Sequence, residues 1–398
     1  MSREARLING IRLGTANAGI RQGLKGNGQA DLAIIEISEG SNVAAVFTQN
    51  AFCATPVTIA RQHLCVQTPR YLLINSGNAN AGNGQEGHQD ALDTCQMLAD
   101  EVSCNREAVL PFSTGVIGER LPMSRFKPAI SEAIQNLCAD GWDATSRAIM
   151  TTDTRPKLAT SDCEVSGKII SVVGIAKGSG MIRPDMATML AYIATDAEID
   201  SDLLDQCCQN AVEKSFNRIT VDGDTSTNDS CILIATGRSG IRINHLDQIQ
   251  KAIDEVFIEL AQAIIRDGEG ATKYITIEVT GGLDKEESLQ VAYTIAHSPL
   301  VKTAFFASDP NWGRLLAAIG RAGISNLDIS KVSVKLENVS LIEKGEPAAS
   351  YTEEQGAAVM AKNEITVYVD LSRGSASETI WTCDLSYDYV KINAEYRT

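Results

Sequence analysis

The middle of the chain places a lysine, a glycine-bearing loop and a threonine in succession. Lys177-Gly178-Ser179-Gly180 precedes Thr188, which opens the apolar segment 189–194. A threonine hydroxyl can attack the carbonyl group before it, exchange the amide for an ester, and let water cut the chain between Ala187 and Thr188. The freed α-amine, with an ordinary pKa near ~7.8, then serves as the base for its own hydroxyl. A buried strand that merely begins with threonine is the competing interpretation, and residue statistics alone favour it.

Nucleotide and calcium motifs match the sequence poorly. A Walker loop needs its lysine after the glycines, whereas Lys177 precedes them, and no G-x-G-x-x-G run opens a helix. The acidic segment 217–229 lacks the glycine and glutamate of an EF-hand loop beginning at Asp222. We interpret this segment as a hydrogen-bonded structural loop.

Histidine chemistry is not expected either. The four histidines are too scattered for a metal pair, and none neighbours a serine or cysteine in a nucleophile signature. We interpret them as surface or structural residues. They are His63, His88, His245 and His297.

Two other hydroxyl-rich segments follow predicted elements. Ser113-Thr114-Gly115 comes after the strand 108–112, and Thr151-Thr152-Asp153-Thr154 follows the helix 142–150. A strand that stops at Thr-Gly exposes a hydroxyl and an N–H at its tip, as a developing oxyanion requires. Taken alone, the first segment is most often a simple turn and the second a helix cap.

The positioning elements are strands alternating with amphipathic helices. The strands 30–38 and 41–48 flank Glu39-Gly40 and predict a hairpin-like pair, and strand 70–74 ends in the asparagine- and glycine-rich loop 75–84. The other predicted helices are 89–102, 127–138, 201–215, 245–266, 286–296 and one that begins with 309–314. The other predicted strands are 162–166, 168–176, 274–280, 301–306, 331–342, 364–371 and 378–385. A tail at 391–398 ends the chain.

Length and composition set the broad class. A chain of 398 residues with no low-complexity linker predicts two closely packed domains. The fold class is therefore mixed α/β (α+β), with sheets covered by helices. A formal charge of -15 disfavours nucleic acid and membrane surfaces as partners. Ten cysteines without a C-x-x-C pair, no signal peptide and no long apolar run predict a cytoplasmic protein.

Several motifs, in order along the chain, together resemble one known family. The sequence closely resembles the ornithine acetyltransferase (glutamate N-acetyltransferase) family of arginine biosynthesis, from about residue 8 to the last residue. The segments that carry the resemblance are 113–115, 151–154, 177–190, 217–229, Glu269 and Asp309-Pro310-Asn311-Trp312-Gly313-Arg314.

The resemblance implies a self-cleaving enzyme of the N-terminal-nucleophile type. It implies a cut between Ala187 and Thr188 into an α chain (1–187) and a β chain (188–398), assembled as an α2β2 heterotetramer. It makes Thr188 the acetyl-accepting nucleophile, with Thr114 and Gly115 forming the oxyanion hole. The implied substrate-binding residues are Thr154, Lys177, Thr188, Glu269, Asn393 and Thr398.

The implied reaction is a ping-pong acetyl transfer. Thr188 takes acetyl from N2-acetyl-L-ornithine and passes it to L-glutamate, which gives L-ornithine and N-acetyl-L-glutamate without a metal or organic cofactor. The residues leave open whether acetyl-CoA is also a donor. Arg183 and Asp185 replace the small residue and the amide of many members, and their effect on self-cleavage is likewise open.

Two other functions stay open at the level of sequence. One is an N-terminal-nucleophile aminopeptidase or amidase, which passes the acyl group to water. The other is an uncleaved amino-acid-binding protein, in which Lys177 and Glu269 hold a ligand without catalysis.

Overall fold

The computed structural model describes residues 7–21, 29–183 and 189–395. The chain divides into two compact units. The first spans 1–217, 224–264 and 397–398, and the second spans 218–223 and 265–396. The class is mixed α/β, as the sequence predicts.

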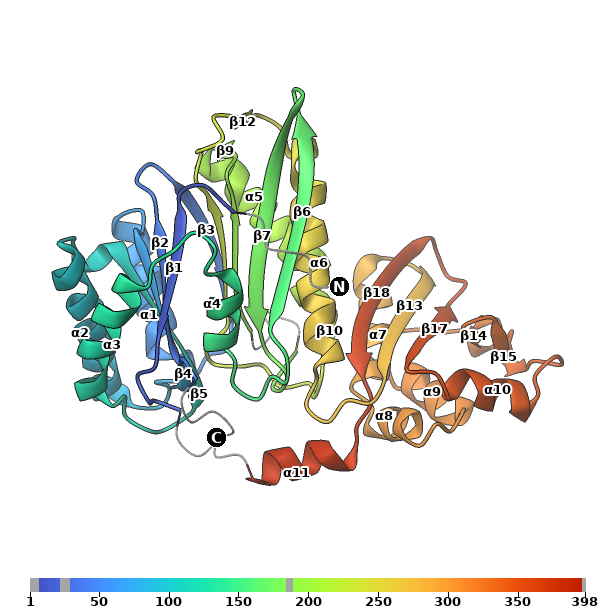
Figure 1. The fold of residues 1–398 in the computed structure, drawn as a ribbon. Helices are drawn as coiled ribbons and strands as arrows, with labels where there is room; N and C mark the ends of the chain where they lie inside the picture. Colours follow the sequence, from blue (N-terminus) through green and yellow to red (C-terminus); the bar gives the residue numbers. More distant parts are fainter. Residues whose placement is uncertain (1–6, 22–28, 184–188, 396–398) are drawn as a thin grey trace. The chain divides into compact units, whose positions relative to one another are not determined.

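Two sheets form the centre of the first unit (Figure 1). One has the order β1-β2-β4-β5, with β1 (Ile11–Ala16), β2 (Leu32–Ile37), β4 (Tyr71–Asn78) and β5 (Val109–Val116). The other has the order β3-β11-β8-β7-β6, with β3 (Asn42–Phe47), β11 (Ser230–Ala235), β8 (Leu190–Thr195), β7 (Lys168–Lys177) and β6 (Lys157–Val165). Two short strands, β9 (Glu198–Ile199) and β12 (Arg242–Ile243), pair separately.

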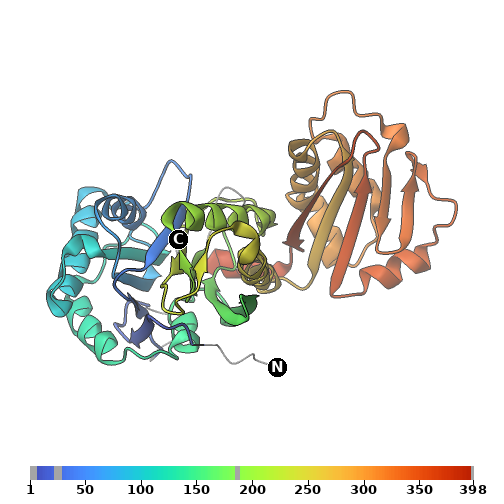
Figure 2. The same cartoon turned by 90° about the horizontal axis from the view of Figure 1, so that it is seen from above.

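The first unit is a four-layer α-β-β-α arrangement (Figures 1 and 2). Ile35 of β2 and Tyr192 of β8 enter one core between the two sheets, whereas the alternate residue Ile34 enters a second core with helices. Because β8 lies in the middle of its sheet, all six of its residues are buried. The helices are α1 (Thr55–Val66), α2 (Gly84–Val102) and α3 (Phe126–Gln135) with the first sheet, α5 (Ser201–Lys214) with the second, and α4 (Trp142–Ala148) against β1 and β7. Helix α6 (Gln250–Arg266) also packs on the second sheet, where Val256 and Leu260 lie next to Gly174 of β7.

The second unit is built on a seven-stranded mixed sheet (Figure 1). Its order is β10-β18-β13-β17-β14-β15-β16, with β10 (Ile219–Thr220), β18 (Ala376–Cys383), β13 (Tyr274–Gly282), β17 (Glu364–Asp370), β14 (Ser333–Leu336), β15 (Val339–Glu343) and β16 (Glu346–Pro347). Its apolar core includes residues of the sheet and of α7, α8 and α9. The helices are α7 (Lys285–Ala296), α8 (Pro299–Phe306), α9 (Trp312–Gly320), α10 (Glu353–Met360) and α11 (Tyr387–Glu395).

The predicted hairpin at 30–48 is wrong, although both strands exist. β2 pairs with β1 and β4, whereas β3 pairs with β11 in the other sheet. Gly40, with φ 81, lies in the connection that carries the chain from one sheet to the other. Local turn chemistry therefore predicted the reversal, but the strands find partners elsewhere.

Three further segments differ from the prediction. The segment 301–306 is helix α8 because Pro299 begins the helix and the Ser298 side chain accepts from the Val301 N–H. The predicted loop 75–84 is strand as far as Asn78, and much of the predicted tail is helix α11. Helix α10 was not predicted. Within the described ranges, no helix is long and apolar enough to cross a membrane.

Candidate active site

Thr114 and Gly115 lie near the end of β5, where it runs parallel to β4. The register shifts there, so that Asn78 of β4 lies opposite both Thr114 and Val116. Gly115 has φ 132, and a Cβ at this position would lie 2.3 Å from the Gly77 carbonyl carbon. This close approach of two backbones requires glycine, so the predicted oxyanion pair lies at a tightly built bulge.

Lys177 is the last residue of β7, in the opposite sheet. Its Nζ donates to Thr114 Oγ1 over 3.1 Å, and both side chains are buried, with 4% and 7% of their surface exposed. An ammonium group can only donate, so the threonine oxygen accepts and its own proton is left to point elsewhere. Two residues that the sequence predicted for one site are thus in direct contact.

Asp153 is the buried anion beside this lysine. Its Oδ1 accepts from Lys157 Nζ over 2.5 Å and from the Gly178 N–H over 2.8 Å, and its Oδ2 accepts from the Thr151 N–H. Burial acts to raise the pKa of Asp153, but the charges of Lys157 and Lys177 and the Gly178 N–H outweigh it and hold the pKa well below its ordinary value. Asp153 therefore stays ionised as a counterion to both lysines.

The segment 151–154 is joined to the lysine loop by a second contact. The hydroxyls of Thr152 and Ser179 lie 2.6 Å apart. Thr154, the predicted substrate-binding residue, follows Asp153 and is exposed. Sequence reasoning assigned no role to Asp153; the available signal was a carboxylate within a short hydroxyl-rich segment, four residues before a lysine.

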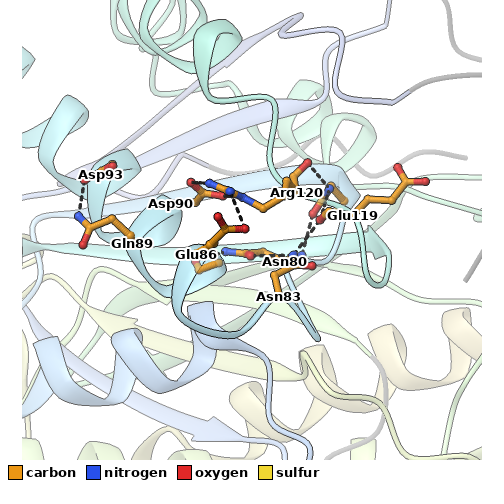
Figure 3. A network of polar contacts seen from close by, with 10 residues as sticks. Asn80, Asn83, Glu86, Gln89, Asp90, Asp93, Glu119 and Arg120 are labelled. Atoms are coloured by element: carbon orange, nitrogen blue, oxygen red, sulfur yellow. Dashed lines mark hydrogen bonds and ion pairs between the residues drawn. The ribbon is translucent and has the colours of Figure 1, made fainter.

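The loop after β4 is fixed by asparagine side chains (Figure 3). Asn78 and Asn83 both donate to the Glu119 carbonyl, over 3.0 and 2.8 Å, and Asn80 donates to the Gly87 carbonyl. Arg120 binds both oxygens of Asp90 through two hydrogen bonds of 2.8 and 2.7 Å. These contacts tie the segments that follow β4 and β5 to each other and to helix α2.

The second unit brings another predicted pair together. Asn393 Nδ2 of α11 donates to Glu269 Oε2 over 2.8 Å. Ser386 Oγ donates to the Gly270 carbonyl over 2.6 Å, and a Cβ at Gly270 would lie 2.4 Å from the Tyr389 nitrogen. Asp384 accepts from Thr272 and Lys273 N–H groups, each over 2.8 Å. The start of α11 and the Glu269 loop therefore form one hydrogen-bonded corner.

Several predicted positions lie outside the described residues. These are Ala187, Thr188 and Thr398, together with Asp185, whereas Arg183 is described and exposed. Among the residues that the structure does describe, no group of three or more His, Cys, Asp or Glu side chains has a metal-binding arrangement. The reaction without a cofactor stays a prediction.

The fold and the site define a mixed α/β protein whose first unit holds a buried threonine, lysine and aspartate cluster between two facing sheets. The chain belongs to the ArgJ family, which matches residues 14–398, and the resemblance found in the motifs is confirmed.

Individual relatives match over nearly the whole chain. The arginine biosynthesis bifunctional protein ArgJ of Methylococcus capsulatus is 56% identical over 396 residues, which covers 98% of this chain and 96% of that protein. The protein of the same name from Pseudomonas syringae pv. tomato is 53% identical over 397 residues, 98% of this chain and 97% of that protein. A crystal structure of the Bacillus halodurans protein of this name, 39% identical, covers 50% of this chain and 96% of that chain with a TM-score of 0.48.

Proposed function

We propose that the chain is a glutamate N-acetyltransferase. It moves acetyl from N2-acetyl-L-ornithine to L-glutamate and releases L-ornithine and N-acetyl-L-glutamate. Membership of the ArgJ family and the arginine biosynthesis named for its relatives support this reaction. The observation that carries it is the contact between Lys177 Nζ and Thr114 Oγ1, because this contact leaves the Thr114 proton available to an oxyanion.

Self-cleavage prepares the nucleophile. The Thr188 hydroxyl attacks the Ala187 carbonyl carbon, the C–N bond breaks, and the nitrogen takes up the proton, which leaves an ester. Water then hydrolyses the ester into the Ala187 carboxylate, the Thr188 hydroxyl and a free α-amine. That amine is the base in the acetyl transfer that follows. This role fits a sequence in which no histidine neighbours a serine or cysteine in a nucleophile signature.

Acetyl transfer repeats the same chemistry on an external amide. The Thr188 hydroxyl attacks the acetyl carbonyl of N2-acetylornithine, the amine of ornithine leaves with a proton, and an acetyl ester remains on Thr188. The α-amine of glutamate then attacks the ester carbonyl carbon, the bond between this carbon and the Thr188 oxygen breaks, and the proton lost by the amine returns to that oxygen. N-acetylglutamate leaves, and the Thr188 hydroxyl is restored. Each step forms an oxyanion, for which the Thr114 hydroxyl and the Gly115 N–H are the proposed donors.

Charged and polar groups hold the amino-acid substrates. Lys177 attracts a substrate carboxylate, Glu269 attracts an ammonium group, and Asn393 adds a polar contact next to Glu269. Thr154 and Thr398 complete this proposed set. The buried position of Lys177 beside Asp153 supports a fixed anchor, since a buried cation is held in one place by its partners.

Assembly and setting complete the proposal. The two cleaved chains form an α2β2 heterotetramer in the cytoplasm, and the reaction needs no metal or organic cofactor. Acetylation of glutamate by the purified protein with acetyl-CoA as the sole donor tests whether the second activity is present. Formation of N-acetylglutamate adds this activity, and its absence limits the donor to N2-acetylornithine.

Mass spectrometry and one transfer assay test the proposed function. The purified chain is expected to give two fragments that join at 187/188, and Thr188→Ala is expected to stay intact at 42.6 kDa and inactive. An uncut wild type would contradict self-cleavage. Release of acetate from N2-acetylornithine at an undiminished rate without glutamate would identify a hydrolase instead.

The oxyanion role has its own variant. Thr114→Ala is expected to lower kcat about 100-fold with the fold intact, since one oxyanion donor contributes about 3 kcal/mol to barrier lowering. Thr114→Ser, which keeps the hydroxyl, is the matched control and is expected to retain most activity. Equal activity of Thr114→Ala and wild type would remove Thr114 from the mechanism.

A further inference from the structure

The end of the acidic segment 217–229 contacts the proposed oxyanion site. The sequence predicted a hydrogen-bonded structural loop here and did not link it to that site. Asn228 is buried, with 7% of its surface exposed. Its Nδ2 donates to the Ala79 carbonyl over 2.7 Å and to the Ser113 carbonyl over 2.9 Å. Ala79 directly follows β4, and Ser113 directly precedes Thr114. One amide therefore joins the ends of both strands that form the proposed oxyanion site.

The next residue, Asp229, holds the strand that follows the predicted cut. Asp229 Oδ1 accepts from the Met189 N–H over 2.9 Å, and the Ser230 N–H donates to the Met189 carbonyl over 3.1 Å. Both main-chain polar groups of Met189 are thus held by residues 229 and 230. The Asp229 carbonyl also accepts from the Thr48 N–H, which fixes Asp229 to the chain beyond β3.

Asp229 is a deeply buried carboxyl group. Only 1% of its surface is exposed, and Oδ2 makes no hydrogen bond of good geometry within the described ranges, although the Ser226 side chain lies near it. Burial raises the pKa of Asp229 well above 3.8, against smaller opposing effects of the Met189 N–H, Ser226 and the Lys177 charge. A carboxamide has nearly the shape of a carboxyl group and keeps an oxygen that can accept from the Met189 N–H, so asparagine is the closest replacement.

We propose that Asn228 and Asp229 are the positioning pair of the acyl-transfer site. Asn228 sets the end of β5 that carries Thr114 and Gly115, and Asp229 sets the main chain at Met189. Because the two residues are adjacent, a single short segment fixes the oxyanion donors relative to the strand that follows position 188. The inference rests on the proposed function and adds two residues to it.

Kinetics of three variants test the pair. Asn228→Ala and Asp229→Ala are each expected to slow self-cleavage and to lower kcat of the cleaved fraction about 100-fold, because small displacements of reacting groups have this effect. KM for both substrates is expected to change little, since neither residue is proposed to touch them. Asp229→Asn is expected to restore both rates nearly to wild type.

Asn42→Ala is the matched control. Asn42 Nδ2 also donates to a distant carbonyl, that of Ile199, over 2.7 Å, but Asn42 pairs with Ala235 at the opposite end of β11. Loss of this contact is expected to lower thermal stability without changing kcat. If Asn42→Ala and Asn228→Ala have comparable thermal stability but only Asn228→Ala has a lower kcat, the loss of kcat comes from positioning and not from general destabilisation.

Three outcomes overturn the inference. Wild-type rates in Asn228→Ala and Asp229→Ala would show that neither residue positions the site. An Asp229→Asn variant as slow as Asp229→Ala would show that a charge at 229 matters rather than its position. A wild type that is uncut or inactive would instead overturn the proposed function, and the proposed role of Asn228 and Asp229 would be rejected together with it. The wild-type sample alone distinguishes this last case.

Discussion

The direction of a single proton connects Lys177 to the chemistry of Thr114. Lys177 Nζ donates to Thr114 Oγ1, so the threonine hydroxyl cannot donate back and must direct its proton elsewhere. The pKa of Asp153 lies well below its ordinary value, although burial alone would raise it. Asp153 is therefore ionised and balances the positive charge of the lysine that is buried next to it.

The charge of Asp153 gives a pH-dependent prediction. Its folded-state pKa lies below the unfolded value near 3.8, so its stabilisation is present above pH 3.8 and is lost as the pH falls through the folded pKa. Asp153→Asn is expected to lower the free energy of unfolding by about 3 kcal/mol at neutral pH, because two buried lysines lose their counterion. The difference from wild type should shrink below pH 3.8.

Urea unfolding at neutral and acidic pH measures this difference. Asp143→Asn is the control, because Asp143 pairs with Arg147 over 2.9 Å with both side chains more than half exposed. Its expected effect on stability is within about 0.5 kcal/mol. A pH-independent effect of Asp153→Asn would show that shape, rather than charge, is what the site needs from Asp153.

At the scale of elements, the bulge between β4 and β5 leaves no room for a side chain at Gly115. A Cβ at Gly115 would lie 2.3 Å from the Gly77 carbonyl carbon and 2.6 Å from the Asn78 nitrogen, and φ there is 132. Gly115→Ala is expected to separate the strands, abolish transfer, and lower the free energy of unfolding by at least about 2 kcal/mol.

Gly118 provides a control for the backbone strain alone. It also has a positive φ, of 81, but a Cβ there meets nothing within 4 Å. Gly118→Ala is expected to lower stability by about 1 kcal/mol and to leave transfer measurable. Denaturant unfolding and the transfer assay compare the two variants. Equal effects would mean that positive φ, and not the contact with β4, explains the need for glycine at 115.

Periodicity predicted most elements, but it could not predict their partners. The 245–266 helix pattern yields α6, and strands 168–176 and 189–194 yield β7 and β8, because their apolar spacing is a local property. The contact between Lys177 and Thr114 joins residues in two sheets, so residue spacing along the chain does not show it. The contact between Asn228 and Ser113 is likewise invisible to residue spacing, because the two residues lie far apart in the chain. Only the resemblance to a known family placed Lys177 and Thr114 in one site.

At the scale of the whole chain, the predicted cut divides one sheet between two polypeptides. Residues 1–187 supply β3, β7 and β6, whereas residues 188–398 supply β11 and β8. In the order β3-β11-β8-β7-β6, the β3–β11 and β7–β8 ladders therefore each join one chain to the other. The Asn228 contacts with Ala79 and Ser113 add further bonds across the same division.

These ladders predict that cleavage leaves the two chains bound to each other. Each ladder joins strands of six or more residues whose side chains lie in a shared core, so separation would expose both sheet edges and that core. We expect the fragments to elute together in native size-exclusion chromatography and to separate only in denaturant. The Thr188→Ala chain, expected to remain uncut, gives the reference elution volume. Separation of the fragments under native conditions would mean that the cut lies elsewhere or that the two ladders do not hold the chains together.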